Sequence, residues 1–112
     1  MSLTNKEIKQ LSFTIILHAG NARSSAMEAI TSAKQFDFDV ARDKITESKE
    51  ELTLAHKEQT TLLQEEAAGE ETNLSIILIH AQDHLMSAIT VKDLANEMIE
   101  MYEKIQHLEA TI

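Results

Sequence analysis

The chain contains no cysteine, no proline and no tryptophan, and it has only two glycines in 112 residues. Without cysteine it forms no disulfide, offers no thiolate to a metal and has no thiol nucleophile. Without proline, and with so little glycine, almost nothing interrupts a helix. These absences predict an all-α protein that folds without covalent cross-links.

Positive charge is also scarce, because ten lysines and arginines stand against nineteen aspartates and glutamates, for a formal net charge of −9. This balance is unsuited to neutralising phosphates along a nucleic acid or an anionic membrane, so we expect no nucleic-acid partner. The apolar run Ile76–Ile79 is far shorter than the roughly 20 residues of a membrane helix. The segment MSLTNKEIKQ lacks the apolar stretch of a signal peptide. We therefore expect a cytoplasmic protein with no direct membrane insertion.

The length of 112 residues corresponds to one domain, residues 1–112, with one thin core. A domain of this size has no room for a deep enzyme cleft, so any active site is expected to use more than one subunit. Two short polar stretches, Gln35–Asp39 and Ala68–Asn73, divide the chain into three helical segments. The predicted fold is an antiparallel three-helix bundle.

The first two predicted helices each carry one stripe of residues for the core. The first, from about Asn5 to Lys34, has a stripe of mostly small residues that lets a neighbouring backbone come close. The second begins after Asp37, a good N-cap, and Gly69 suits its C-terminal end. Its many acids are expected to form a solvated face. The two stripes are Ile8, Ile15, Ala19, Ala22, Ala26, Ala29 and Ala33, and then Ala41, Ile45, Ser48, Leu52, Ala55, Gln59 and Leu62.

The third predicted helix, from about Asn73 to His107, is apolar on nearly every face in its first half. Between Thr72 and Val91 the only formally charged residue is Asp83. A helix that is apolar all round has to be buried all round, and two companion helices cover only part of its circumference. We therefore expect a homo-oligomer with the third helices at its centre. An apolar seam can continue the contact as a coiled coil: Leu94, Met98, Met101 and Ile105.

Four polar residues interrupt this apolar helix: His80, Gln82, Asp83 and His84, in the run IHAQDHLM. Spacings of three and four place His80, Asp83 and His84 on neighbouring positions of one helical face. Burying a carboxylate and two imidazoles costs several kcal/mol unless they are paired, hydrogen-bonded or bound to a metal. We therefore expect these polar side chains to have a chemical or structural role.

From the spacing alone, three interpretations of this constellation stay open. A neutral imidazole near its unperturbed pKa of about 6.5 is a nucleophile that can accept a phosphoryl group. Two imidazoles four residues apart, with a carboxylate between them, can share a metal ion, although they supply few ligands. A buried polar layer can instead fix the register of an oligomer.

Two segments of the chain resemble a known family: HAGNARSSAMEAI at 18–30 and, more specifically, HAQDHLMSAI at 80–89. They are similar to the enzyme IIA component of the lactose/cellobiose (chitobiose) family of the bacterial phosphoenolpyruvate-dependent sugar phosphotransferase system (PTS). The length, the acidic balance and the three-helix layout agree with this resemblance from end to end.

The resemblance implies a homotrimer of three-helix subunits, nine helices in all, that carries a phosphoryl group. The first histidine of HAQDH, His80, would receive the group from the histidine-phosphorylated carrier HPr. It would pass the group to a cysteine of the cognate IIB component, which phosphorylates the sugar at the membrane-bound IIC. The acid of the motif, Asp83, would face the threefold axis, where three copies share one divalent cation.

Elementary chemistry agrees with the roles of His80 as phosphoryl acceptor and of Asp83 as cation ligand. Three carboxylates that converge in an apolar core repel one another unless they are protonated or hold a cation. A hard ion such as Mg²⁺ suits three aspartates better than Zn²⁺ does, and on the axis it would be structural. No lysine or arginine lies between Thr72 and Val91, as suits a carrier that must release the phosphoryl group readily. We expect Gln82 and His84 to support the transferring oxygens.

The sequence gives weaker indications of the roles of four further residues. His18 is expected on or near the packed side of the first helix, as a satisfied core histidine or as a group that approaches the site from a neighbouring chain. His56 and His107 are expected at the surface without a role. Arg23 is expected to pair with an acid, or to contact a phosphohistidine or a partner.

The predicted function is a cytoplasmic phosphocarrier for uptake of a β-disaccharide of the lactose, cellobiose or chitobiose class. One alternative is a structural trimeric helical scaffold with a metal-stabilised axis and no transfer chemistry. Another is a hydrolytic metal enzyme that uses His80, Asp83 and His84. Only the carrier becomes covalently modified, and only the hydrolase needs a metal for turnover.

Overall fold

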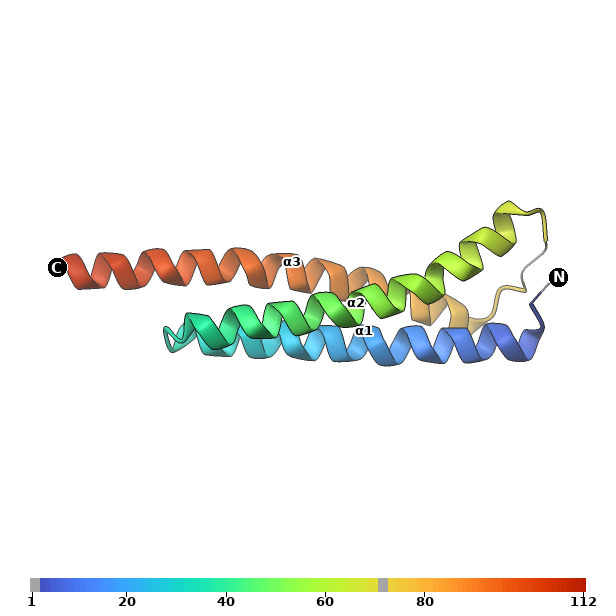
Figure 1. Ribbon diagram of the computed structural model, residues 1–112, viewed down its shortest axis with the longest axis horizontal. Helices are drawn as coiled ribbons and strands as arrows, with labels where there is room; N and C mark the ends of the chain where they lie inside the picture. The colour runs from blue at the N-terminus through green and yellow to red at the C-terminus, as the bar shows by residue number, and fades with distance from the viewer. Residues whose placement is uncertain (1–2, 71–72) are drawn as a thin grey trace.

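The computed structural model describes residues 3–70 and 73–112. It consists of three helices, α1 (Asn5–Lys34), α2 (Phe38–Ala67) and α3 (Ile76–Thr111). They form one elongated bundle of 64 × 20 × 19 Å in which α2 runs antiparallel to both α1 and α3 (Figure 1). The predicted antiparallel three-helix bundle is confirmed. In the described part of the chain no helix is both long and apolar enough to cross a membrane.

Side-chain caps explain where each helix begins. Thr4 caps α1 in a reciprocal pair with Glu7, and the Asp37 carboxylate accepts a hydrogen bond from the Val40 amide at the start of α2. Both starting points agree with the predicted ones. The third helix begins later than predicted, because the Ser75 hydroxyl accepts from the amide of Leu78 and so fixes the first turn there.

The connection between α2 and α3 contains the predicted break Ala68–Asn73, of which residues 71 and 72 lie outside the described part of the chain. Ala68 is the C-cap of α2, and Gly69 follows it with a φ of 87°. This left-handed backbone conformation costs little only for glycine, so Gly69 ends α2 as the sequence predicts.

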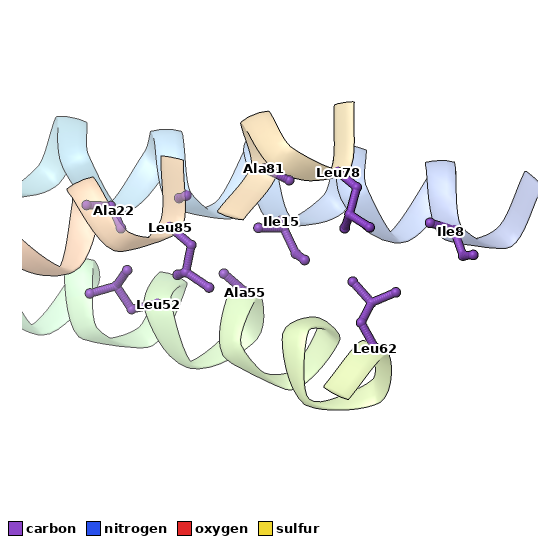
Figure 2. Packing of buried hydrophobic residues seen from close by; sticks show 11 residues of the cluster. Ile8, Ile15, Ala22, Leu52, Ala55, Leu62, Leu78, Ala81 and Leu85 are labelled. Atoms are coloured by element: carbon purple, nitrogen blue, oxygen red, sulfur yellow. The ribbon is translucent and has the colours of Figure 1, made fainter. Parts of the chain in front are cut away.

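The core is a layer of small and branched side chains that the three helices share (Figure 2). Ile15 of α1 and Leu85 of α3 are completely buried there. The predicted stripe of α1 is buried at every position, and the stripe of α2 is buried except for Gln59, which is half-buried. Because alanine dominates the inner face of α1, the other two helices approach its backbone closely.

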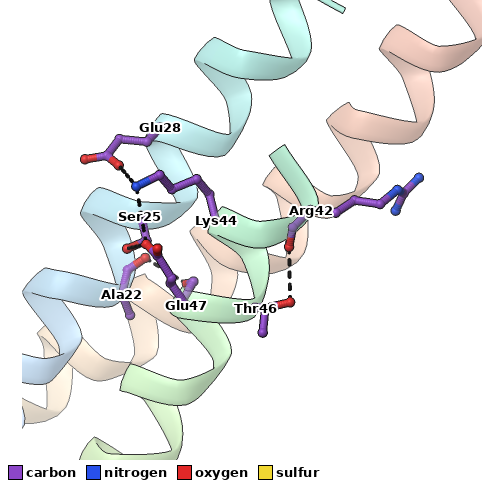
Figure 3. Close-up of polar contacts among 8 residues, drawn as sticks. Ala22, Ser25, Glu28, Arg42, Lys44, Thr46 and Glu47 are labelled. Carbon is purple, nitrogen blue, oxygen red and sulfur yellow. Dashed lines mark hydrogen bonds and ion pairs between the residues drawn. The ribbon is translucent and has the colours of Figure 1, made fainter. Parts of the chain in front are cut away.

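Polar contacts fix α2 against α1 along the middle of the bundle. Figure 3 shows Lys44 of α2 with its ammonium near the carboxylates of Glu28, at 2.8 Å, and Glu47, at 3.4 Å. The hydrogen bonds that the Lys44 ammonium donates to these two carboxylates raise the pKa of Lys44, and the bond to Glu28 has the larger effect. Beneath them the buried Ser48 hydroxyl donates to the Ala22 carbonyl oxygen at 2.7 Å. Such a contact satisfies a polar group that would otherwise be costly to bury.

The last turns of α2 diverge from α3 (Figure 1). The side chains of the two helices line a groove there. The groove has a volume of about 400 Å³. Its lining is mostly apolar and comes from Leu62, Leu63, Glu66, Leu74, Leu78, Ile79 and Gln82. This opening lies beside the first turns of α3, where the HAQDH motif is found.

The close packing of α1 predicts that Ala26 does not tolerate a larger side chain. Ala26 is fully buried in a core cluster that includes Ala95 and Ile99 of α3, whereas the neighbouring Met27 is half exposed. Ala26→Leu is expected to lower the free energy of unfolding by about 1–3 kcal/mol, because the added carbons force the helices apart. Urea unfolding at one fixed protein concentration measures the effect. Met27→Leu is the control, and equal midpoints for the two variants would contradict close packing at Ala26.

Candidate functional site

His80 and His84 form a pair one turn apart near the start of α3. Their rings meet edge to face, with centroids 4.4 Å apart and planes at 87°. His80 is exposed in the single chain and His84 is half-buried. The spacing therefore brings the two imidazoles together as predicted, and it leaves His80 open to an incoming reactant.

Asp83 lies about 60° around α3 from His80, on a neighbouring position as predicted, in the middle of an uncovered apolar surface that we call the Asp83 face. Met101 lies a whole number of turns from Asp83 and so points in the same direction. The apolar members of the Asp83 face, all exposed in the single chain, are Ile76, Ile79, Met86, Leu94, Met98, Met101, Ile105, Leu108 and Ile112. Such a long exposed apolar surface is typical of a protein–protein interface.

The single chain does not provide the buried setting that the sequence suggests for the motif. His80 and Asp83 are both exposed in it. Their burial would require other copies of the chain against the Asp83 face. Within the described residues of one chain, no three histidine, aspartate or glutamate side chains come together in a way that could hold a metal ion. The described residues of one subunit therefore offer no complete metal site of the hydrolase type.

Gln82 lies on the flank of α3 opposite to that of His80 and His84, because it follows His80 by about 200° around the helix. It is half-buried and faces α2, where the Gln59 side-chain amide nitrogen donates to its oxygen at 2.8 Å. His56, one turn before Gln59, has its Nδ1 3.0 Å from the Gln59 amide oxygen. Within one chain, Gln82 and His80 therefore do not share a site.

His18 is a satisfied histidine at the contact between α1 and α2. Its Nδ1 lies 2.6 Å from a carboxylate oxygen of Glu51, and the Asn21 amide donates to the same oxygen at 3.4 Å. The first of the two interpretations of His18 is thus the one seen in the single chain. The sequence assigns Glu51 to a solvated face. In the structure it is half-buried at this contact, where it accepts these two bonds.

Arg23 lies beside the Asp83 face. It is exposed, and it lines a shallow hollow together with Met86, Ser87, Thr90 and Val91 of α3. No carboxylate lies within 4 Å of its guanidinium among the residues that the structure describes, so the predicted acid partner is not found within this chain. His107 is exposed near the end of α3, as predicted.

Sequence reasoning missed the part that α2 plays beside the motif. It placed Gln59 in the core stripe and gave His56 no role, whereas both belong to a hydrogen-bonded row that ends on Gln82. The spacing of three between His56 and Gln59 was a visible signal that the two side chains share a face. Their contact with α3 depends on the register between two helices, for which the sequence carries no local signal.

Comparison with known proteins identifies the family. Residues 10–103 match the family described as "PTS system, Lactose/Cellobiose specific IIA subunit". The lichenan-specific phosphotransferase enzyme IIA component of Bacillus subtilis (strain 168) is 57% identical over 101 residues, which cover 90% of this chain and 92% of that protein.

Solved structures agree with the sequence match. The PTS cellobiose-specific enzyme IIA from Bacillus anthracis has a TM-score of 0.87 at 50% identity, with 94% of each chain covered. The IIA(chitobiose)–HPr complex of the Escherichia coli phosphotransferase system has a TM-score of 0.78 at 36% identity, with 89% of this chain and 97% of that chain covered. With the three-helix fold and the HAQDH motif on α3, these matches show that the chain belongs to the lactose/cellobiose-specific IIA subunits of the PTS.

Proposed function

We propose that this IIA subunit is a phosphocarrier that accepts a phosphoryl group from phospho-HPr on His80 and passes it to a cysteine of the cognate IIB component. The observation that carries the proposal is the exposed His80 imidazole of the HAQDH motif, next to His84, in a chain of the IIA family. The structure of a relative, the IIA(chitobiose)–HPr complex, supports HPr as the donor.

The proposed transfer balances as a displacement at phosphorus. A lone pair on a ring nitrogen of neutral His80 forms the new N–P bond, while the N–P bond to the HPr histidine breaks. The electron pair of the broken bond stays on the HPr imidazole, which takes up the proton that His80 releases. In the second step a cysteine thiol of IIB gives up its proton and forms the S–P bond while the N–P bond at His80 breaks. The His80 imidazole keeps the electron pair of that bond and takes up the proton.

The Asp83 face supports a homotrimer in which three copies of α3 pack around a threefold axis. Its apolar side chains recur at alternating steps of three and four residues from Leu94 to Ile112, which is the pattern of a coiled-coil seam. Assembly along this seam would bury the face and bring three Asp83 carboxylates together. Their oxygen donors fit a hard divalent cation such as Mg²⁺, which would neutralise their mutual repulsion and hold the subunits together.

The same arrangement gives roles to Gln82 and His84. In a parallel threefold packing, the flank of α3 that carries His80 and His84 meets the opposite flank of the next copy, which carries Gln82. His84 would then support the phosphoryl oxygens from the same subunit, and the Gln82 amide from the neighbouring one. Neither side chain carries the permanent positive charge of a lysine or arginine, so they stabilise the oxygens without holding the group as tightly.

The proposed final acceptor of the phosphoryl group is a β-disaccharide that the cell takes up. IIB would pass the group to a sugar of the lactose, cellobiose or chitobiose class as it enters through the membrane component IIC. The specificities of relatives, lichenan and cellobiose among them, support this class of β-linked sugar. We place the carrier in the cytoplasm, where HPr and phosphoenolpyruvate are found.

The direct test is intact mass after incubation with phosphoenolpyruvate, enzyme I and HPr. A carrier gains the mass of one phosphoryl group per chain, and peptide mapping at alkaline pH, which preserves phosphohistidine, places it on His80. Addition of the IIB component should then remove the group again. If the chain gains no mass while HPr in the same mixture is phosphorylated, the scaffold alternative replaces the carrier.

A further inference from the structure

A row of three hydrogen-bonded side chains leads from the exposed His56 of α2 to the motif on α3. His56 Nδ1 lies 3.0 Å from the Gln59 amide oxygen, and the Gln59 amide nitrogen donates to the Gln82 amide oxygen at 2.8 Å. His56 is exposed, whereas Gln59 and Gln82 are half-buried between the helices. The row therefore crosses from one helix to the other beside the groove that Gln82 lines.

The placement of the amide atoms gives the row its direction. With the Gln59 oxygen as acceptor, the His56 Nδ1 is the donor, in the tautomer that carries its hydrogen there. The Gln59 nitrogen then donates to the oxygen of Gln82, which leaves the NH₂ group of Gln82 as the end of the row. Among the residues that the structure describes, that NH₂ group has no acceptor within the chain.

We propose that His56 and Gln59 are positioning residues that orient the Gln82 amide so that its NH₂ group, and not its oxygen, faces the transferred phosphoryl group. The inference rests on the proposed function, in which Gln82 of one subunit supports the phosphoryl oxygens on His80 of the next. A side-chain amide has nearly the same shape in either orientation, and only its partners decide which end points outward. The anionic oxygens are attracted by the NH₂ group and repelled by the carbonyl oxygen.

Gln59→Glu tests the direction of the row without changing its shape. A glutamate at 59 can only accept, so it draws the NH₂ group of Gln82 toward α2 and turns the Gln82 oxygen outward. We expect the rate constant for phosphoryl transfer from phospho-HPr to fall about tenfold or more. We also expect the phosphohistidine at His80 to hydrolyse at a changed rate, since a different group of Gln82 then faces the phosphoryl oxygens.

Two variants separate orientation from charge. Gln64→Glu makes the same chemical change at an exposed position of α2 that has no side-chain hydrogen bond to α3 among the described residues, and it should transfer at the wild-type rate. Gln59→Met removes the donor without adding charge. It frees the Gln82 amide to turn, so its transfer rate should lie between those of the wild type and Gln59→Glu.

A change at the far end of the row tests whether orientation is transmitted. His56→Glu turns a donor into an acceptor, which draws the Gln59 nitrogen toward position 56 and reverses both amides in sequence. We expect a loss of transfer rate similar to that of Gln59→Glu. In the Gln59→Met background the same change at His56 should have no further effect, because the row is already broken.

The readouts distinguish this inference from a structural role and from the proposed function itself. The side-chain amide signals of Gln82 in ¹⁵N–¹H spectra should shift in Gln59→Glu and His56→Glu, while the midpoint of urea unfolding stays near that of the wild type. Equal transfer rates for Gln59→Glu and Gln64→Glu, in a protein whose wild type is phosphorylated on His80, would overturn the positioning role alone. Absence of phosphorylation in the wild type would overturn the carrier function, and the inference with it.

Discussion

His80→Ala is expected to abolish phosphorylation of the chain, with a fall in the transfer rate of about three orders of magnitude or more. Alanine has no nitrogen to form the bond to phosphorus, and His84 cannot replace His80 because it is half-buried against the bundle. The fold should persist, since His80 is exposed in the single chain. Intact mass and circular dichroism on the same sample measure the two expectations.

The controls for His80→Ala are alanine variants of the two other histidines of α3. His84→Ala should still gain one phosphoryl group, although more slowly, because it loses only a supporting donor. His107→Ala, at an exposed position near the end of α3, should react at the wild-type rate. A full gain of mass in His80→Ala would place the nucleophile elsewhere, and loss of helicity would give His80 a structural role.

The same experiment discriminates between the classes of function. A hydrolytic metal enzyme would turn over its substrate without a stable mass gain, and it would lose activity with a chelator. A carrier becomes modified in stoichiometric amount, and the axial cation proposed for Asp83 takes no part in the chemical step. Phosphorylation of His80 that continues in the presence of a chelator, with the trimer held together by high protein concentration, therefore favours the carrier.

Much of the fold could be predicted from the sequence because local signals determine it. Asn5 and Lys34 bound the first helix as predicted, and Asp37 caps the second, since a side chain that bonds to nearby amides is visible in the sequence. The start of the third helix was predicted too early. Ser75 competes with several polar residues before it as a cap, and only the backbone geometry shows that it is the one that bonds the Leu78 amide.

The site could be predicted only in part, because its partners lie on other helices. The spacing of His80 and His84 predicts their contact, because one helical turn separates them. The pairing of His18 with Glu51 and that of Gln82 with Gln59 depend on how far one helix slides along another. Apolar periodicity tells which faces meet but does not fix that axial register to one residue, so acids and amides at helix contacts look like ordinary surface residues.

Asp83→Leu is expected to keep the trimer and to raise its stability by about 1–4 kcal/mol. On the proposed axis the change replaces three converging carboxylates with apolar side chains, and such replacement of buried charge by leucine of similar volume is neutral or stabilising. Sedimentation at decreasing protein concentration measures the dissociation of the trimer, and urea unfolding at a fixed concentration measures its stability. A chelator should weaken the wild-type trimer and leave Asp83→Leu unchanged, because only the carboxylates need a cation.

The outcome for Asp83→Leu depends on where Asp83 lies in the assembly, which makes the variant a test of the axial placement. Asp43→Leu, at an exposed position on α2, adds the same apolar side chain away from the Asp83 face and should leave the dissociation of the trimer unchanged. If Asp83→Leu dissociates into monomers, the carboxylates hold the subunits together by contacts that leucine cannot make, and Asp83 lies off the axis. If chelation affects both proteins equally, the cation binds elsewhere. A gain in stability that removes the sensitivity to chelation is the result that only three carboxylates around a shared cation predict.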